Sequence, residues 1–220
     1  MKLIIYNGSP RGQKSNTKLL MEEFIKGLSD SEEYELEMYY IVKRKDHRSA
    51  LEAYAEAENV IFAFPLYTDS MPGIVKDFIE LLHPYSNLEK GPAMGFVVQS
   101  GFPEPAHSRY IEKYLEQFAK RMNSPYLGTI VKGGVEGIQI MPGWMTKKLY
   151  KRFFDLGQFF AKTGQFDRKI MKKLAPKERM SKGSLWFFKI MRKTRMGNFY
   201  WDSQMKKNGV FDIRFDKPFA

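Results

Sequence analysis

Five short apolar runs, each followed by a helical pattern, constrain the fold of this chain more than any other feature of its sequence. The runs occupy residues 2–6 (KLIIY), 35–41 (ELEMYYI), 59–64 (NVIFAF), 93–99 (AMGFVVQ) and 126–131 (YLGTIV). Such alternation is typical of a parallel sheet with helices on both faces. The first and third runs are apolar on both sides, as buried strands must be, whereas the second alternates and is expected nearer an edge. We therefore predict a three-layer, doubly wound α/β domain.

Apolar residues at helical spacing predict the helices between these strands, and an Ala- and Glu-rich stretch at 46–58 predicts a further one. From residue 165 onward the pattern is again helical, with one late strand signal at 210–215. We accordingly expect a domain over residues 1–164 and a helical extension over 165–220. The apolar stripes are Leu20, Phe24 and Leu28; Ile74, Phe78 and Leu81; Ile111, Leu115, Phe118 and Met122; and Leu149, Phe153, Leu156 and Phe160.

Composition narrows the chemistry and the compartment. With 43% hydrophobic residues the chain can bury a sizeable core. No run approaches the ~18 apolar residues of a membrane span, and the first residues carry no signal-peptide pattern, so a cytoplasmic protein is expected. The absence of cysteine excludes disulfides, thiolate chemistry and cysteine-ligated clusters or zinc sites. Any redox chemistry must therefore belong to a bound cofactor.

Positive charge is concentrated near the C-terminus. Residues 145–220 contain 20 of the 36 lysines and arginines but only 6 of the 25 acidic residues. Aromatic residues are interleaved with these cations, and the segment 184–195 (SLWFFKIMRKTR) mixes large apolar side chains with four cations. Such a segment could bind an anionic membrane surface, a nucleic acid or an acidic protein partner. Solvated lysines around a packed aromatic stripe, or a dimerisation or lid element, explain the same residues.

The loop after the first strand has the residues of a phosphate site. It reads NGSPRGQKSNT from Asn7 and joins a buried strand to an amphipathic helix. Free N–H groups at the helix start, hydroxyl and amide donors and one arginine together favour an anion. The spacing matches neither the dinucleotide nor the triphosphate glycine motif, which favours a terminal monophosphate. Alternatively, this is an ordinary strand–helix turn in which Ser15 or Asn16 caps the helix.

The loops after the third and fourth strands carry aromatic residues at the same predicted sheet edge. In the first of them, PLYTDSMPG, Tyr67 lies between two prolines. This pattern is expected to leave backbone N–H and C=O groups free to contact the polar edge of a planar ligand. Alternatively, Tyr67 covers the end of the strand. In the second, Gly101 permits close backbone approach and Phe102 could flank a ring. His107 and Glu104 are candidate acid–base groups, although a helix-start or surface role is favoured for His107.

In an open parallel sheet, ligands bind beyond the carboxyl ends of the strands, where these three loops should meet. A phosphate site beside two aromatic-bearing loops implies a flat aromatic cofactor with one terminal phosphate. FMN is such a molecule. Because flavin carries the redox chemistry itself, we name no catalytic acid or base and no metal site.

The motifs NGSPRGxxSNT, PLYxxxMPGxxKDFIE and SGFPE resemble those of the flavodoxin-like NAD(P)H-dependent FMN reductase family, over residues 1–163. The resemblance implies a flavodoxin-like five-stranded sheet of order 2-1-3-4-5, a homodimer, and hydride transfer from NAD(P)H through FMN to a small acceptor. Two departures are the missing cysteine motif of the family's iron–sulfur branch and the long basic extension. The residues that would bind FMN by this resemblance are Ser9, Arg11, Ser15, Asn16 and Thr17 at the phosphate, Pro65, Leu66, Tyr67 and Thr68 at the isoalloxazine, and Ser100, Gly101, Phe102 and Glu104 at its other edge.

Two functions follow from this sequence. The first is an FMN-dependent NAD(P)H oxidoreductase that reduces a quinone, free flavin, nitro or azo compound. The second is a flavodoxin-like electron carrier or redox-responsive binding protein that docks an acidic partner through the basic extension. The strong positive charge disfavours a simple carrier, because flavodoxins present an acidic docking surface. The sequence fixes neither the acceptor nor the choice between NADH and NADPH.

Overall fold

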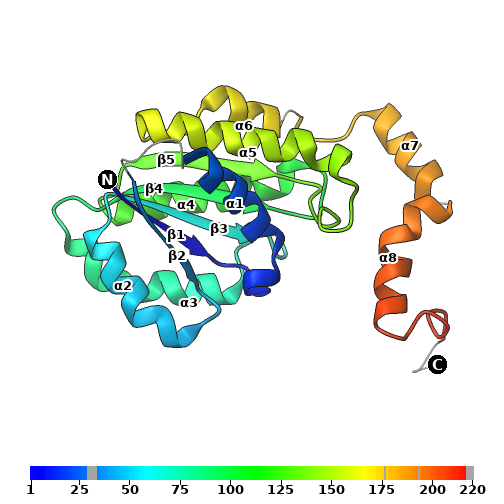
Figure 1. The fold of residues 1–220 in the computed structure, drawn as a ribbon, viewed down its shortest axis with the longest axis horizontal. Helices are drawn as coiled ribbons and strands as arrows, with labels where there is room; N and C mark the ends of the chain where they lie inside the picture. The colour runs from blue at the N-terminus through cyan, green and yellow to red at the C-terminus, as the bar shows by residue number, and fades with distance from the viewer. Residues whose placement is uncertain (29–33, 176, 193, 217–220) are drawn as a thin grey trace. The chain divides into compact units, whose positions relative to one another are not determined.

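A computed structural model describes residues 1–28, 34–175, 177–192 and 194–216. The chain divides into two compact units, Met1–Glu178 and Arg179–Ala220. The first contains a five-stranded parallel sheet of order β2-β1-β3-β4-β5 (Figure 1). The strands are β1 (Lys2–Asn7), β2 (Glu35–Tyr40), β3 (Asn59–Pro65), β4 (Ala93–Gln99) and β5 (Tyr126–Lys132). All five expected strands are present, and β2 lies at an edge as its alternating pattern predicts.

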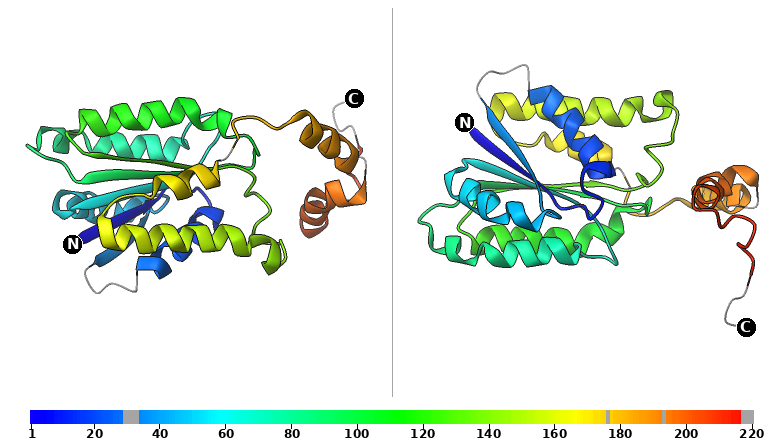
Figure 2. Two further views of the ribbon diagram at one scale, coloured as in Figure 1. Left: turned by 90° about the horizontal axis from the view of Figure 1, so that it is seen from above. Right: turned by 60° about the horizontal axis from the view of Figure 1, so that its bottom comes forward.

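Helices cover both faces of this sheet, as the two views of Figure 2 show. The α-helices of the first unit are α1 (Asn16–Leu28), α2 (His47–Glu56), α3 (Gly73–Leu81), α4 (Arg109–Arg121), α5 (Gly143–Thr163) and α6 (Arg168–Leu174). Short 3-10 helices occupy Gly12–Lys14, Arg44–Asp46, His83–Asn87 and Pro105–Ser108. The second unit contains α7 (Lys182–Arg192) and α8 (Arg195–Lys207). The flavodoxin-like arrangement with a helical C-terminal extension is therefore confirmed.

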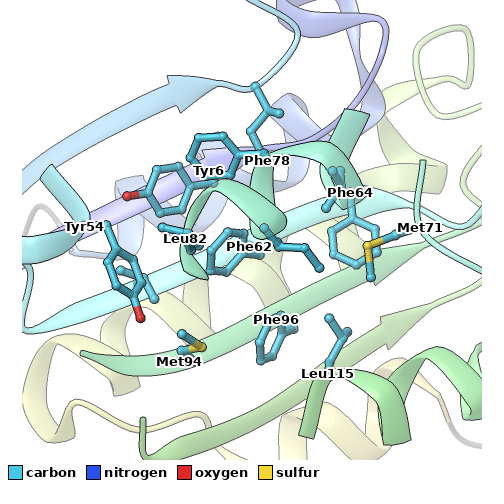
Figure 3. Packing of buried hydrophobic residues seen from close by; sticks show 14 of the residues in the cluster. Tyr6, Tyr54, Phe62, Phe64, Met71, Phe78, Leu82, Met94, Phe96 and Leu115 are labelled. Carbon is cyan, nitrogen blue, oxygen red and sulfur yellow. The ribbon is translucent and has the colours of Figure 1, made fainter. Parts of the chain in front are cut away.

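Successive side chains of the central strands enter two separate cores, because strand side chains alternate between the two sheet faces. In β3, Phe62 and Phe64 pack with α2, α3 and α4, whereas Ile61 and Ala63 pack with α1, α5 and α6. Figure 3 shows the first core, in which Tyr6 stacks on Phe62 with ring centroids 4.8 Å apart. Both faces of β3 are buried, which accounts for its continuous apolar sequence.

Two expectations about individual elements are wrong. The stripe in α3 is rotated: Phe78 is buried as expected, but Leu81 is 46% exposed, and Val75 and Ile79 are buried with it. The apolar residues of α3 cover about half of its circumference, and Leu81 lies at one edge of that arc, so the sequence does not fix which part of the arc faces the sheet. Residues 210–215 form turns rather than a strand, since the second unit offers them no strand to pair with among its described residues.

The first part of the expected extension, residues 165–178, belongs to the first unit. Helix α6 lies beyond the expected boundary at residue 164, yet it packs on β5 and α5, and Leu174 is 3% exposed in the second core. Phe166, in the turn before α6, is also buried there. No helix in the described part of the chain has the length and apolar character needed to cross a membrane.

Candidate functional site

The three loops expected to form a site meet at the carboxyl edge of the sheet around one small cavity. The cavity has a volume of about 30 Å³, room for about one water molecule. Eight of the thirteen expected residues line it, together with two that had not been assigned a role, Gln99 and Glu136. The eight are Ser9, Arg11, Asn16, Pro65, Leu66, Tyr67, Ser100 and Gly101.

The first loop is folded by hydrogen bonds among its own polar groups. Asn7, at the end of β1, accepts a bond from the Ser9 N–H at 3.0 Å through its side-chain oxygen. The Ser9 hydroxyl in turn accepts from the Arg11 N–H at 3.3 Å. Gly12 closes the turn at a φ of +52°, a value that favours glycine. This folding holds Arg11 at the cavity with half of its side chain exposed.

Ser15 caps helix α1. Its hydroxyl donates to the Gly12 carbonyl at 2.6 Å and accepts from the Lys18 N–H at 3.1 Å, so both its polar functions are used inside the protein. The alternative interpretation of Ser15 as a helix cap is therefore confirmed. Ser15 lies outside the cavity, as does Thr17, whose hydroxyl accepts from the Gln99 amide at 3.3 Å.

Asn16 connects the first loop to the segment that follows β5. Its amide nitrogen donates to the carbonyls of Val135 and Glu136 at 2.8 and 3.2 Å, and its oxygen accepts from Gln139 at 2.8 Å. Among the described residues, no acceptor faces the main-chain N–H groups of Asn16 and Thr17 in the first turn of α1. The side chains of Ser15 and Asn16 are thus occupied, and the first loop can offer an anion these main-chain N–H groups and the side chains of Arg11 and Ser9.

Glu136 was missed by the sequence interpretation, and it is the closest charge to Arg11. Its carboxylate accepts from the Arg11 guanidinium at 2.8 Å. It lies in GGVEG, after β5, at the same sheet edge as the other loops; an acidic residue among glycines at a strand end was the signal that could have identified it. Its side-chain stem also lies 3.3 Å from where a Cβ at Gly101 would stand, so Glu136 narrows the cavity.

The loop after β3 contains a tight turn in a strained conformation. The Tyr67 and Ser70 N–H groups bond to each other's carbonyls at 2.8 and 3.1 Å, and the Leu66 N–H donates to the Gln99 carbonyl at 2.7 Å. The expectation of free backbone groups is wrong for these three residues. Between them, Thr68 and Asp69 have φ values of +49° and +61°, unusual for non-glycine residues and most of all for a β-branched one.

Tyr67 is 44% exposed at the cavity, so its ring surface is accessible to a ligand. Leu66, the residue before it, is 5% exposed and packs in the first core. Thr68 lies outside the cavity lining, in the strained turn. A planar ligand at this edge could therefore contact Tyr67 and the chain around Gly101.

Phe102 and Glu104 face His107 instead of the cavity. The Phe102 and His107 rings are stacked with centroids 4.8 Å apart, and the His107 Nδ1 lies 3.2 Å from an Asp69 carboxylate oxygen. The nearest Glu104 oxygen is 4.0 Å from the His107 Nε2. His107 thus links the loops after β3 and β4, consistent with the surface role favoured for it.

Two larger clefts of the first unit are lined by neither the loop after β3 nor the loop after β4. One, of about 410 Å³, lies between α4, β5 and α6, and the other, of about 460 Å³, lies beside the loop after β1, between Lys14 and Ser15 and the start of α5. Neither is lined by more than one of the three expected loops. Within the described ranges, no group of three His, Asp or Glu side chains is arranged to hold a metal ion.

Comparisons with known proteins agree with this fold. A family model described as a flavodoxin-like fold matches residues 1–142. No curated protein matches the chain by sequence. Three solved structures illustrate the fold at low identity, and each resembles about three quarters of this chain.

The first is an FMN-dependent NADH-azoreductase from Bacillus anthracis, solved with FMN, with a TM-score of 0.58 at 14% identity, covering 73% of this chain and 100% of its own. The second is an NAD(P)H:quinone oxidoreductase from Methanothermobacter marburgensis, with a TM-score of 0.59 at 13% identity. The match covers 76% of this chain and 98% of the oxidoreductase. The third is a Trp repressor binding protein from Bacillus subtilis, with a TM-score of 0.52 at 18% identity. The match covers 71% of this chain and 95% of the Trp repressor binding protein.

Proposed function

Because the chain belongs to the flavodoxin-like fold family that its first 142 residues match, we propose that it is an FMN-dependent NAD(P)H oxidoreductase. It passes a hydride from the nicotinamide to bound FMN and then to a small acceptor such as a quinone, free flavin, nitro or azo compound. The observation that carries the proposal is the convergence of three loops on one cavity, which Arg11 and Asn16 line from the first loop, Tyr67 from the second and Gly101 from the third. The azoreductase of the same fold, which was solved with FMN, supports it.

The residues of the first loop that line the cavity suit a phosphate. They offer an exposed guanidinium on Arg11, the Ser9 hydroxyl and the N–H group of Asn16 at the positive end of the α1 dipole. A phosphate bound there must displace the Glu136 carboxylate from Arg11, because the two anions compete for one cation. The carboxylate also keeps the charge of Arg11 balanced when no ligand is present.

The residues around Tyr67 suit a flat ring lying over the mouth of the cavity, because the cavity itself has room for only about one water molecule. Tyr67 presents an exposed aromatic face, and Gly101 lets the backbone after β4 come close to a ligand edge. A flavin supplies the hydride chemistry at its own ring, so these residues need only bind, orient and limit access of water.

The test is a visible absorption spectrum of the purified chain with added FMN, followed by NADPH or NADH without oxygen. Binding of FMN, bleaching of its absorption bands on addition of the nicotinamide, and multiple turnovers with a quinone would support the oxidoreductase. A flavoprotein that binds FMN but is reduced only through a protein reductase would instead be the carrier or binding protein. A folded chain that binds no flavin contradicts both.

Arg11→Ala tests the phosphate side. Loss of one charge-assisted hydrogen bond, about 1.5–3 kcal/mol, should weaken FMN binding by roughly tenfold to a hundredfold. Riboflavin, which lacks the phosphate, should bind the variant and the parent chain equally well. The matched control is Arg48→Ala, because Arg48 is also an ion-paired surface arginine, 3.1 Å from Glu52 on α2. Equal FMN affinity in Arg11→Ala and the parent chain would contradict the assignment of this loop.

A further inference from the structure

The described side chains of the second unit, residues 179–220, form no buried core. Helices α7 and α8 contact each other, and Figure 1 shows them in succession. Yet every described side chain between 179 and 216 is exposed or only partly buried. The large apolar residues that are at least 40% exposed are Leu185, Trp186, Phe187, Ile190, Phe199, Trp201, Val210, Ile213 and Phe215. Apolar exposure on this scale marks a surface that binds something.

Part of this apolar surface lies on one face of α7. Trp186 and Ile190 are four residues apart and Phe187 and Ile190 three apart, which places the three on adjacent positions of the helix surface. Their exposed fractions are 66%, 60% and 43% for Trp186, Phe187 and Ile190. On α8, Phe199 and Trp201 are exposed to a similar extent, at 64% and 61%.

The same unit is strongly cationic. Residues 179–220 contain ten lysines and arginines against three aspartates. Near the end of α8, cations and aromatics are in contact: the Arg214 guanidinium lies 3.8 Å from the Phe211 ring centre and 4.6 Å from that of Phe215, and the Lys206 ammonium lies 4.7 Å from Phe211. Exposed apolar and cationic groups therefore occur together within this unit.

We propose that residues 179–220 dock on an anionic lipid bilayer. Exposed tryptophan and phenylalanine side chains insert at the lipid interface, and lysines and arginines bind the anionic headgroups. A second copy of this unit would bring the same positive charge, which opposes self-association. A nucleic acid would satisfy the cations but would not bury Leu185 and Ile190, the exposed aliphatic side chains of α7. With eleven residues, α7 is about 16 Å long, half the thickness of the hydrocarbon layer, so it lies along the surface.

The test uses the full chain and vesicles of phosphatidylcholine, with or without 30% phosphatidylglycerol. Co-sedimentation with the anionic vesicles only, weakened by 0.5 M NaCl, is the expected result. A Trp144→Phe background leaves Trp186 and Trp201 as the tryptophans, and their emission should shift to shorter wavelength on binding. Equal binding to both vesicle types, or none, overturns the proposal.

Matched pairs of variants locate the binding surface. Trp186→Ser/Ile190→Ser should lower vesicle affinity at least tenfold, whereas Trp144→Ser, at a 78% exposed tryptophan of the first unit, should not. Lys206→Glu/Lys207→Glu should likewise lower it at least tenfold, whereas Lys147→Glu/Lys148→Glu, an exposed pair on α5, should not. Equal losses of vesicle affinity in the test and control variants would show that the second unit is not the docking surface.

Three further readouts distinguish other occupants. A dimer in sedimentation equilibrium that Trp186→Ser/Ile190→Ser dissociates would mean a second copy. Tighter salt-dependent binding to a nucleic acid duplex than to anionic vesicles would mean a nucleic acid. A lower Tm of the first unit in Trp186→Ser/Ile190→Ser would mean that the tail packs on its own chain. Each result overturns the bilayer proposal, and none depends on the proposed redox activity.

Discussion

Glu136 controls how much of the positive charge of Arg11 is available to a ligand. The two side chains are 2.8 Å apart and are 34% and 50% exposed, so their ion pair is partly screened by water. In the proposed enzyme, the carboxylate has to leave Arg11 before a phosphate can bind. The strength of this pair is therefore subtracted from the affinity for FMN.

Glu136→Gln should tighten FMN binding about two- to fivefold, because a pair at this exposure contributes roughly 0.2–1 kcal/mol. Fluorescence titration with FMN measures the change, and riboflavin affinity should stay the same. Glu22→Gln is the control, since Glu22 forms a comparably exposed pair with Lys18 at 3.2 Å on α1. Weaker FMN binding in Glu136→Gln would mean that the carboxylate helps to hold the ligand instead of competing with it.

At the residue scale, the sequence predicted the loops better than the roles of their side chains. The motif around Asn16 correctly indicates a polar loop at the sheet edge. It does not indicate that the Asn16 amide binds carbonyls about 120 residues further along the chain. Phe102 likewise meets His107, a partner that only the folded loop brings within reach. Motifs describe local chemistry, whereas these contacts depend on tertiary structure.

At the scale of elements, helices α1 and α5 are in unusually close contact. A Cβ added at Gly157 would lie 2.0 Å from the Phe24 carbonyl oxygen, and one added at Gly27 would lie 2.1 Å from the Phe154 carbonyl oxygen. Because the obstacles are backbone atoms, no side-chain rotation can relieve them. The two helices can pack at this distance only because both positions are glycine.

Gly157→Ala should therefore lower the free energy of unfolding by about 1–3 kcal/mol or more, through a forced separation of α1 and α5. Urea unfolding followed by circular dichroism measures it. Gly143→Ala, in the first turn of α5, has no atom within 4 Å of the added carbon and should change stability by no more than about 0.5 kcal/mol. Similar stabilities for the two variants would show that the helices separate without loss.

The existence and order of the elements were largely predictable, because periodicity is a strong signal in long segments. The orientation of α3 was not, since two neighbouring stripes of its sequence are equally apolar. The strand signal at 210–215 failed for another reason. A run of β-branched and aromatic residues such as VFDIRF becomes a strand only where a partner strand is present, and the described part of the second unit has none.

At the scale of the whole molecule, three partly or fully buried tyrosines link the fold to pH. Burial is the main cause that raises the pKa of Tyr6 above its ordinary value of about 10, and it raises the pKa of Tyr54 and Tyr126 to about 12. They come from β1, α2 and β5. Each tyrosine therefore stays protonated to a higher pH in the folded chain than in the unfolded chain.

The free energy of unfolding should therefore be retained below pH 10 and fall between pH 10 and 12. Each such tyrosine contributes a slope of about 1.4 kcal/mol per pH unit. Burial and nearby Arg152 lower the pKa of Lys132 in the folded chain. Deprotonation of Lys132 therefore makes the free energy of unfolding rise with pH, but only up to pH 10.5, the ordinary pKa of a lysine in the unfolded chain. Urea unfolding at several pH values measures the fall. Tyr54→Phe should make it shallower and Tyr110→Phe, at a 78% exposed tyrosine, should not; a flat profile to pH 12 would contradict the linkage.

The division of the chain after residue 178 also has a consequence for the order in which the protein is made. Every strand and every residue of the two cores precedes residues 179–220. At about 5–20 residues per second, the ribosome takes several seconds to add that last segment, far longer than helices or hairpins need to form. The sheet domain can thus begin to close around its cores while the segment proposed to meet the bilayer is still being synthesised.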